Sequence, residues 1–390
     1  MIRWREGKVV RERAHWGDAV EVDVQVISVG DHATRDPRGE SQAPEPGPIV
    51  RALAYRSVTG EPVVGDRVLL NTNALDNELG TGGVAMVVAL PDRLPADAGD
   101  DAADPAGAGH LVKARYTPLQ TMVFGVDEQD SPHHSALDGA ADLAGLPVVV
   151  ADLHSSIPAV LAGLRERAPG VVVAYLMTDG GALPAAFSRA CASLREDGWL
   201  ASVISCGQAY GGDLEAVNVF SGLLAARHVV RADAVIVAQG PGNLGTGSTW
   251  GFSGVSAGEA LNAAAVLGGA GVATLRVSGA DPRQRHRGIS HHSRTAYARL
   301  LNRPADVPVP LLRGHCGIDD ALADEVLRQA DELVEAGPHL TRHDIDLTGL
   351  DRALADSPVR LSTMGRGLRD DPAAFLTAAA AGRHAASLLC

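Results

Sequence analysis

The sequence predicts an α/β fold: a mostly parallel sheet with helices on both faces, preceded by a small β-barrel or sandwich and followed by a helical segment. Two observations predict it. From about residue 126 to 300, short apolar runs alternate with longer helical patterns, which is typical of βαβ units. Before about residue 125, short runs alternate apolar and polar residues between turn signals, as in small β-domains. We therefore expect domains over 1–125, 126–300 and 301–390.

In the N-terminal domain, Val20–Val26 alternates apolar and polar residues, and Val63–Leu70 holds a Gly-Asp turn signal before a second apolar run. These patterns indicate short strands. Two segments, near 36–48 and 91–109, are rich in Pro, Gly, Ala and acidic residues. They bury too little apolar surface to offset the entropy of ordering, so we expect mobile surface loops there.

Five apolar runs are the expected strands of the sheet. They lack polar alternation, as strands covered on both faces should. The runs are Pro147–Ala151, Val171–Met177, Leu200–Ser205, Ala234–Ala238 and Val272–Val277. Start signals for the intervening helices are Ser155 or Ser156 before Pro158, then Pro184, then Asp213 as the cap of a helix over Leu214–Ala226. A further helix is expected over Ala257–Leu267.

The segment after residue 301 is expected to be mainly helical and to pack on the α/β domain. Asp319–Ala336 is amphipathic and ends at Gly337-Pro338, a stop signal. Asp370 or Asp371, followed by Pro372, begins a last Ala-rich helix.

Net charge, apolar runs and cysteine spacing argue against several classes of protein. The formal net charge of −13 over 390 residues argues against nucleic acid or an anionic membrane surface as the main partner. No run approaches the roughly 18 apolar residues of a membrane helix, and the first residues hold no secretory signal. The four cysteines are scattered, which favours free thiols in a reducing compartment. We expect a cytoplasmic protein, with a homodimer as the default assembly.

The candidate site follows from the expected sheet. In open parallel sheets, ligands bind outside the carboxyl ends of the strands, near the point where strand order reverses. The loops after all five expected strands are rich in Gly, Asp, His and hydroxyl residues. These loops are 152–156, 178–181, 206–213, 239–247 and 278–281.

The segment from Gly240 to Gly254 is the most distinctive of these loops. Its glycines let the backbone approach a ligand and present N–H groups to an anion, while Trp250 and Phe252 could stack on a ring. Its G-x-G-x-x-G pattern follows a late strand without the expected acidic partner, and no Walker-type lysine is present. A long structural turn is the alternative. The expected ligand-binding residues are Gln208, Gln239, Gly240, Gly242, Asn243, Gly245, Thr246, Gly247 and Arg287.

Histidines form a second group: His133, His134, His154, His286, His291 and His292. Near aspartates, neutral imidazoles could hold Zn²⁺ or a similar divalent metal, or act as general acids and bases. Their spacing matches no metal motif, so both roles and a structural role remain open. Whether His133 and His134 reach the His154 site is also open.

Cys206 stands at an expected strand end, before the helix predicted at Asp213. A helix N-terminus lowers a thiol pKa, which would favour a nucleophile with His154 as its base. A buried cysteine that fills space is the commoner case. The candidate catalytic residues are His154, Asp179, Cys206, His291 and His292. Arg366, between two glycines, is expected to be a solvated loop arginine or to close over an anion.

Five sequence segments resemble segments of a known protein family. The segments are Gly211–Asn218, Gln239–Asn243, Trp250–Gly254, Arg285–His292 and Met177–Gly180. In these segments, and over nearly the whole chain, the sequence resembles an uncharacterised bacterial family common in actinobacteria, the domain of unknown function 3866. The resemblance implies a cytosolic bacterial protein with no settled activity, and it carries over no catalytic residues.

Two functional hypotheses follow. The first is an enzyme that binds a small anionic ligand at the carboxyl-end loops, with hydrolysis or group transfer favoured over redox chemistry because no dinucleotide fingerprint is convincing. The second is a non-catalytic metabolite-sensing or assembly protein, in which the same loops bind the ligand and the β-domain contacts a partner or another subunit.

Overall fold

A computed structural model describes residues 2–27, 46–78, 83–95 and 109–389. The chain divides into two compact units, Met1–Gly107 with Tyr116–Thr121, and Ala108–Arg115 with Met122–Cys390. Each unit has its own hydrophobic core. Most of the two expected mobile loops, 36–45 and 96–108, lies outside the described residues.

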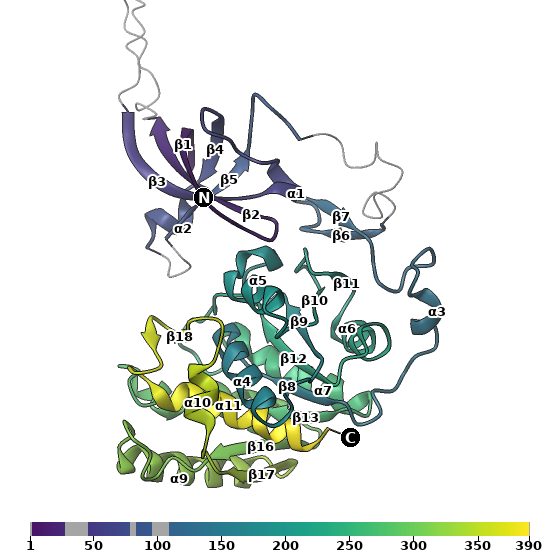
Figure 1. Cartoon of the computed structure of the whole chain (residues 1–390), viewed down its shortest axis with the longest axis vertical. Helices are drawn as coiled ribbons and strands as arrows, with labels where there is room; N and C mark the ends of the chain where they lie inside the picture. The colour runs from purple at the N-terminus through teal and green to yellow at the C-terminus, as the bar shows by residue number, and fades with distance from the viewer. Residues whose placement is uncertain (1, 28–45, 79–82, 96–108, 390) are drawn as a thin grey trace, which may run out of the picture. The chain divides into compact units, whose positions relative to one another are not determined.

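The first unit contains a closed five-stranded barrel in the order β1-β2-β3-β5-β4 (Figure 1). Its strands are β1 (Trp4–Trp16), β2 (Ala19–Ile27), β3 (Pro46–Tyr55), β4 (Arg67–Asn71) and β5 (Ala85–Ala89), with short helices α1 (Arg56–Thr59) and α2 (Asn73–Asp76). The valines of β2 fill the barrel core, as its alternation predicts. Its polar residues are covered too, because Arg11 and Arg13 of β1 both bind the Asp23 carboxylate.

The second unit contains an eight-stranded parallel sheet in the order β11-β10-β9-β12-β8-β13-β16-β17. Its strands are β8 (Pro147–Val150), β9 (Val173–Thr178), β10 (Ser202–Cys206), β11 (Leu214–Ala216), β12 (Ala234–Gln239), β13 (Ala270–Ala273), β16 (Ala305–Pro310) and β17 (Leu340–Ile345). All five expected strands are confirmed, and β8, β9, β10 and β12 are buried along their whole length. Full burial explains why these strands show no polar alternation.

Helices flank the sheet. In Figure 1, α4 (Ile157–Arg167), α10 (Leu350–Ala355) and α11 (Pro372–Ser387) lie together. A second group consists of α6 (Val219–Ala225), α7 (Ser256–Val266) and the π-helical turn η7 (Arg294–Leu300). Further helical segments are α3 (His134–Leu137), α5 (Arg189–Glu196), the π-helical turn η4 (Ala226–Val230) and α9 (Asp320–Ala336). Across the described residues, no helix has the length and apolar character needed to cross a membrane.

The predicted start of one helix is wrong, because the helix begins five residues later than expected. Residues Leu214–Ala216 form β11, and α6 begins only at Val219, capped by Asn218 in a capping box with Ser221. Asp213 is not a helix cap, because its carboxylate accepts the backbone N–H of Val203 at 2.7 Å and ties the loop to β10.

The segment after residue 301 forms two strands as well as the expected helices. It contributes β16 and β17 to the sheet, between and beside the expected helices α9 and α11. Prolines 308 and 310 in β16, and the charged residues of β17, hide these strands from an apolar-run pattern. β17 is the edge strand of the sheet, where polar residues meet water.

Candidate functional site

The sheet reverses its winding at the β12–β8 pair. The chain leaves β8 for β9 towards one edge of the sheet, and later leaves β12 for β13 towards the other edge. The carboxyl ends of β8, β12 and β13 therefore lie at the place where open α/β sheets bind ligands. Asp152 just after β8, Gln239 at the end of β12 and Thr274 just after β13 are all buried.

Arg276 joins three elements at this edge. Its Nη1 lies 3.2 Å from Nδ1 of His292 and 3.7 Å from Oδ2 of Asp152. The imidazole Nδ1 of His292 lies 3.4 Å from the same Oδ2. All three side chains are less than one tenth exposed. Arg276 follows β13, Asp152 follows β8, and His292 belongs to the helical turn α8 (His291–Ser293).

His292 is one of three neighbouring histidines. The possible metal-binding atoms of His286, His291 and His292 all lie within 4.8 Å of one another. Ser290 organises them, because its Oγ accepts the backbone N–H of His292 at 3.2 Å and lies 2.7 Å from Nδ1 of His286. His286 ends the turn η6 (Gln284–His286), and the short antiparallel pair β14 (Val277–Ser278) and β15 (Gly288–Ile289) holds that turn near β13.

Burial favours the neutral form of His286 and His291. It lowers the pKa of His286 to about 3, with the charges of Arg276 and Arg283 acting in the same direction. Burial also lowers the pKa of His291 to about 4, helped by the charges of His292 and Arg285. Near neutral pH these two imidazoles are uncharged, which is the form that accepts a proton or binds a metal.

The Gly-rich loop is closed by its own hydrogen bonds. The Thr246 N–H donates to the carbonyl of Gly251 at 2.8 Å, and the hydroxyls of Thr246 and Ser248 lie 3.0 Å apart. Asn243 Oδ1 accepts the Ser253 hydroxyl at 2.9 Å. Gly242 and Gly247 have φ of 96° and 83°, conformations that favour glycine. Gly245 pairs with Phe252 in an isolated bridge.

Two glycines at the start of this loop have a packing role. A Cβ on Gly240 would collide with the carbonyl oxygen of Ala182, and one on Gly181 with that of Gly240. The loops after β9 and β12 can therefore pack backbone to backbone, as the Ala182 N–H to Pro241 carbonyl bond of 2.9 Å shows. These contacts account for both glycines without a ligand.

Several buried polar atoms at this edge have no hydrogen-bond partner among the described residues. Gln239 donates through Nε2 to the Asp152 carbonyl at 2.8 Å, but its Oε1 is unpartnered. The same holds for Asp152 Oδ2, Thr274 Oγ1 and His291 Nε2. Buried polar groups are nearly always hydrogen-bonded, so this edge has hydrogen-bonding capacity that a ligand or water would satisfy.

His154 is paired with a cysteine other than the expected Cys206. The thiol within hydrogen-bonding distance of His154 Nε2 is that of Cys191, at 3.4 Å, and the His154 ring meets Tyr175 edge-on. Burial lowers the pKa of His154 to about 4. The expected Cys206–His154 hydrogen bond is not among the described contacts.

The reason to expect a reactive Cys206 is also removed. No helix begins at Asp213, and burial raises the pKa of the Cys206 thiol to about 12, with the charge of Asp179 acting in the same direction. Asp179 is exposed, and its Oδ2 accepts the backbone N–H of Gln208 at 3.0 Å. These residues form a group at the ends of β9 and β10.

Three other expected residues lie outside the Arg276 centre. Arg287 is exposed beside β15. His134 Nδ1 lies 2.9 Å from the carbonyl of Asp127. Neither His133 nor His134 belongs to a group of three or more possible metal ligands within the described residues.

A second group of three possible metal ligands consists of Asp306, His343 and His384. These residues are already paired with one another, because the Asp306 carboxylate lies 3.1 Å from His343 Nε2 and 2.8 Å from His384 Nε2.

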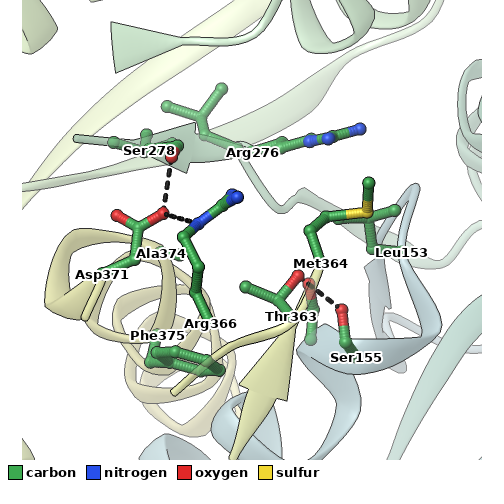
Figure 2. Close-up of a pocket in the computed structure, with 13 residues that line it drawn as sticks. Leu153, Ser155, Arg276, Ser278, Thr363, Met364, Arg366, Asp371, Ala374 and Phe375 are labelled. Carbon is green, nitrogen blue, oxygen red and sulfur yellow. Dashed lines mark hydrogen bonds and ion pairs between the residues drawn. The ribbon is translucent and has the colours of Figure 1, made fainter. Parts of the chain in front are cut away.

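A pocket adjoins Arg276 (Figure 2). Its walls come from the ends of β8 and β13, the hairpin β18 (Ser362–Thr363) and β19 (Arg366–Gly367), and the start of α11. Arg366 is not a solvated loop residue, since its Nε lies 3.2 Å from Asp371 Oδ2. That oxygen also accepts the Ser278 hydroxyl at 2.5 Å. The Ser155 hydroxyl donates to Thr363 at 2.9 Å across the pocket.

Sequence reasoning missed Arg276, Ser278 and Asp371 as members of one site. Arg276 falls inside the expected strand Val272–Val277, although the strand ends at Ala273. An arginine within an otherwise apolar run was the signal that could have found it. Asp371 comes from the far end of the chain, and no local pattern connects it to β13.

Comparison with known proteins gives a family but no activity. Among proteins of curated function, none matches this chain. Among solved structures, the crystal structure of hydrogenase maturation factor HypB from Archaeoglobus fulgidus is similar over 57% of this chain and 92% of that one, with 14% identity and a TM-score of 0.28. A likeness at that level carries no argument about function. The family model for the protein of unknown function DUF3866 matches residues 51–382, and the chain therefore belongs to the DUF3866 family.

Proposed function

We propose that the pocket beside Arg276 binds a small anionic ligand. The observation that carries this proposal is the guanidinium of Arg276. Its side chain is 8% exposed, and among the described residues its nearest recorded carboxylate oxygen is 3.7 Å away, beyond hydrogen-bonding distance. A buried cation is costly unless it is paired and hydrogen-bonded, so an anion in the pocket would complete its surroundings.

The walls of the pocket fit the same ligand class. Arg366 supplies a second guanidinium, and Ser156 and Thr363 supply hydroxyl donors, while the hydroxyls of Ser155 and Ser278 already donate to Thr363 and Asp371. Arg366 is itself held by Asp371 and lies 3.5 Å from Asp281, so it contributes a fixed positive group. Guanidinium and hydroxyl donors of this kind suit phosphate or carboxylate oxygens.

An enzymatic role is the more specific form of the proposal. The neutral His286 and His291 could accept a proton from water or a hydroxyl, and Arg276 could stabilise a developing negative charge. These parts suit hydrolysis or group transfer on a phosphate or carboxylate ester.

The test is thermal unfolding with inorganic phosphate and, separately, acetate at constant ionic strength. A ligand that binds only the folded state raises its melting temperature, and we expect a rise of at least about 3 °C for one of the two anions. Arg276→Gln should abolish the rise. The matched control is Arg352→Gln, whose side chain is 90% exposed, and it should keep the full effect.

An equal rise in the wild type and Arg276→Gln, or an equal rise with chloride, would show that the anions act without this pocket. Circular dichroism of each variant, taken at 20 °C before heating, separates lost binding from lost folding. Calorimetric titration of the same anion at the same ionic strength gives the affinity change directly.

A further inference from the structure

We propose that His286, His291 and His292 bind one divalent metal ion, zinc or a transition metal with the same preference for imidazole. The site goes beyond the anion pocket, and anion binding there does not depend on it. It is built from residues 286–292, whereas the pocket is lined by segments 153–156 and 275–278, the β18–β19 hairpin and the start of α11. With an ion bound, these histidines would act as its ligands and not as the general bases considered above.

The distances fit a single ion with little movement. Zinc binds imidazole nitrogen at about 2.0–2.1 Å, so two nitrogens on one ion lie at most roughly 4 Å apart. The possible ligand atoms of the three histidines lie within 4.8 Å of one another. Small rotations of the rings would bring all three to bonding distance. His286 and His291 have ring centroids 5.0 Å apart, and His291 and His292 4.4 Å apart.

The hydrogen-bonding contacts of His286 and His292 indicate which ring nitrogen each would offer to a metal. His286 has its Nδ1 2.7 Å from Ser290 Oγ, which leaves Nε2 for a metal. His292 has its Nδ1 3.2 Å from Nη1 of Arg276, a group that can only donate, and 3.4 Å from Asp152 Oδ2. With a metal on Nε2, Nδ1 would carry the proton and donate it to Asp152 Oδ2, which has no hydrogen-bond partner among the described residues, and the Arg276 guanidinium would turn away from the ring. A metal-bound histidine commonly donates its other N–H to a carboxylate in this way.

His291 gives an independent indication. Its Nε2 is buried and has no hydrogen-bond partner in the described part of the chain. An unpaired imidazole nitrogen is costly in a protein interior. A shared ion would satisfy it and would also hold the three rings together. Three imidazoles this close cannot all be protonated, because like charges at such distances repel strongly.

The charged side chains around the three histidines determine which kind of fourth ligand the ion would bind. Three protein ligands leave a fourth position open, as in catalytic rather than structural zinc sites. Arg276, Arg283 and Arg285 act on these histidines electrostatically, and only Asp152 and Asp281 oppose them among the acidic groups recorded in contact with this centre. An excess of positive charge favours hydroxide or another anion at the open position over neutral water.

The experiment measures bound metal directly. Full-length protein is stripped with a chelator, dialysed against buffered Zn²⁺, and analysed by elemental mass spectrometry and by calorimetric titration. We expect one zinc per chain in the wild type. His291→Gln and His286→Gln should each weaken zinc binding by at least about 100-fold. The matched control, His343→Gln, removes a histidine from the other His–Asp cluster and should keep one zinc at unchanged affinity.

A measurement on the wild type decides the matter if a variant fails to fold. X-ray absorption of the zinc-loaded protein should show imidazole nitrogen at about 2.0–2.1 Å and no sulfur. A sulfur shell, absence of stoichiometric zinc, or loss of zinc in His343→Gln with retention in His291→Gln would each overturn the proposal. Arg276→Gln, which should lose the anion effect, should keep zinc, so failure of the two proposals can be told apart.

Discussion

Phe252 stacks face to face on the imidazole of His292, with ring centroids 3.8 Å apart and planes inclined by 3°. Phe252 is the last aromatic residue of the Gly-rich loop and is 5% exposed. The sequence indicated an aromatic side chain that could stack on a ring, and the ring is a histidine of the protein itself. The loop therefore reaches the histidine cluster through an aromatic contact.

This contact predicts a stability effect. Phe252→Leu keeps an apolar side chain but removes the stacked ring and leaves space beside His292, so we expect the free energy of unfolding to fall by about 1–3 kcal/mol. Urea denaturation followed by circular dichroism measures it. Leu244→Ala, at a side chain of the same loop that is 70% exposed, should change it by less than about 0.5 kcal/mol. Equal effects would mean that the stack adds nothing.

The sequence was sufficient for five of the eight strands of the sheet and insufficient for the site. Buried strands of a parallel sheet are short apolar runs, and β8, β9, β10 and β12 follow that rule closely enough to be recognised singly. β17 does not, because its edge position admits Arg342, His343 and Asp344. The Asp213 error has a similar cause: a residue suited to capping helices serves instead to tie a loop to β10.

Single site residues could be predicted from the sequence, but the contacts that bring them together could not. His291 and His292 were expected, and their juxtaposition with His286 depends on the β14–β15 pair, which two residues on each strand form. The contact of Arg276 with Asp152 depends on β13 lying next to β8, a matter of strand order. The Asp371–Ser278 bond spans 93 residues of chain. No periodicity or local motif encodes such pairings.

Helices α4 and α11 approach each other through glycine. A Cβ on Gly163 would overlap the carbonyl oxygen of Ala379, and one on Gly382 would overlap that of Val160. We therefore expect Gly163→Ala to lower the free energy of unfolding by about 1–3 kcal/mol, through forced separation of the helices. The control is Gly170→Ala, where a Cβ meets nothing within 4 Å. Its stability, measured by the same denaturant titration, should be unchanged or slightly raised.

The chain has two lysines, Lys8 and Lys113, and they differ sharply in burial. Lys113 is 1% exposed, donates to the carbonyls of Gly207 and Ala209 at 2.8 and 2.9 Å, and lies 3.4 Å from Glu215. Lys113→Met leaves these acceptors buried and unpaired, so we expect a loss of about 3–5 kcal/mol. Lys8→Met, at an exposed position of β1, should cost less than about 0.5 kcal/mol.

A double variant tests the mechanism of that loss. Burial raises the pKa of Glu215, and the charge of Lys113 acts in the opposite direction. Removal of the lysine therefore leaves the buried Glu215 carboxylate without its compensating charge. Lys113→Met with Glu215→Gln removes the uncompensated charge, while the glutamine can still accept from the Ser205 hydroxyl. We expect it to regain part of the lost stability in the same titration. If the double variant is no more stable than Lys113→Met, the carbonyl acceptors dominate the cost.

The cysteines should differ in reactivity. Burial raises the pKa of both Cys191 and Cys206 to about 12, so at pH 8 only about one molecule in 10⁴ carries a thiolate at either position. Cys316 is exposed. Peptide-level mass spectrometry after iodoacetamide treatment of the native protein should find Cys316 alkylated, and Cys191 and Cys206 alkylated only after unfolding. Rapid native labelling of Cys206 would restore the nucleophile hypothesis that the structure argues against.

Asp306 predicts a defined dependence of stability on pH. Burial alone would raise its pKa, but hydrogen bonds from His384 and His343 outweigh burial and hold the pKa below its usual value of 3.8. A carboxyl with a depressed pKa in the folded state contributes stability above its unfolded pKa and loses it as pH falls through the folded pKa. We therefore expect the free energy of unfolding of the wild type to fall as pH is lowered below about 4, with a share of the fall due to Asp306.

Asp306→Asn isolates that share. The variant should be less stable than the wild type near neutral pH, where the wild-type carboxylate is charged and paired with both histidines, and the difference should shrink as pH is lowered below about 4. Urea titrations at several pH values measure the difference. Asp356→Asn, at a side chain that is 69% exposed, should run parallel to the wild type throughout. A constant difference for Asp306→Asn would mean that the carboxylate acts by shape and hydrogen bonding alone, because only a group whose proton affinity changes on folding can alter the slope of stability with pH.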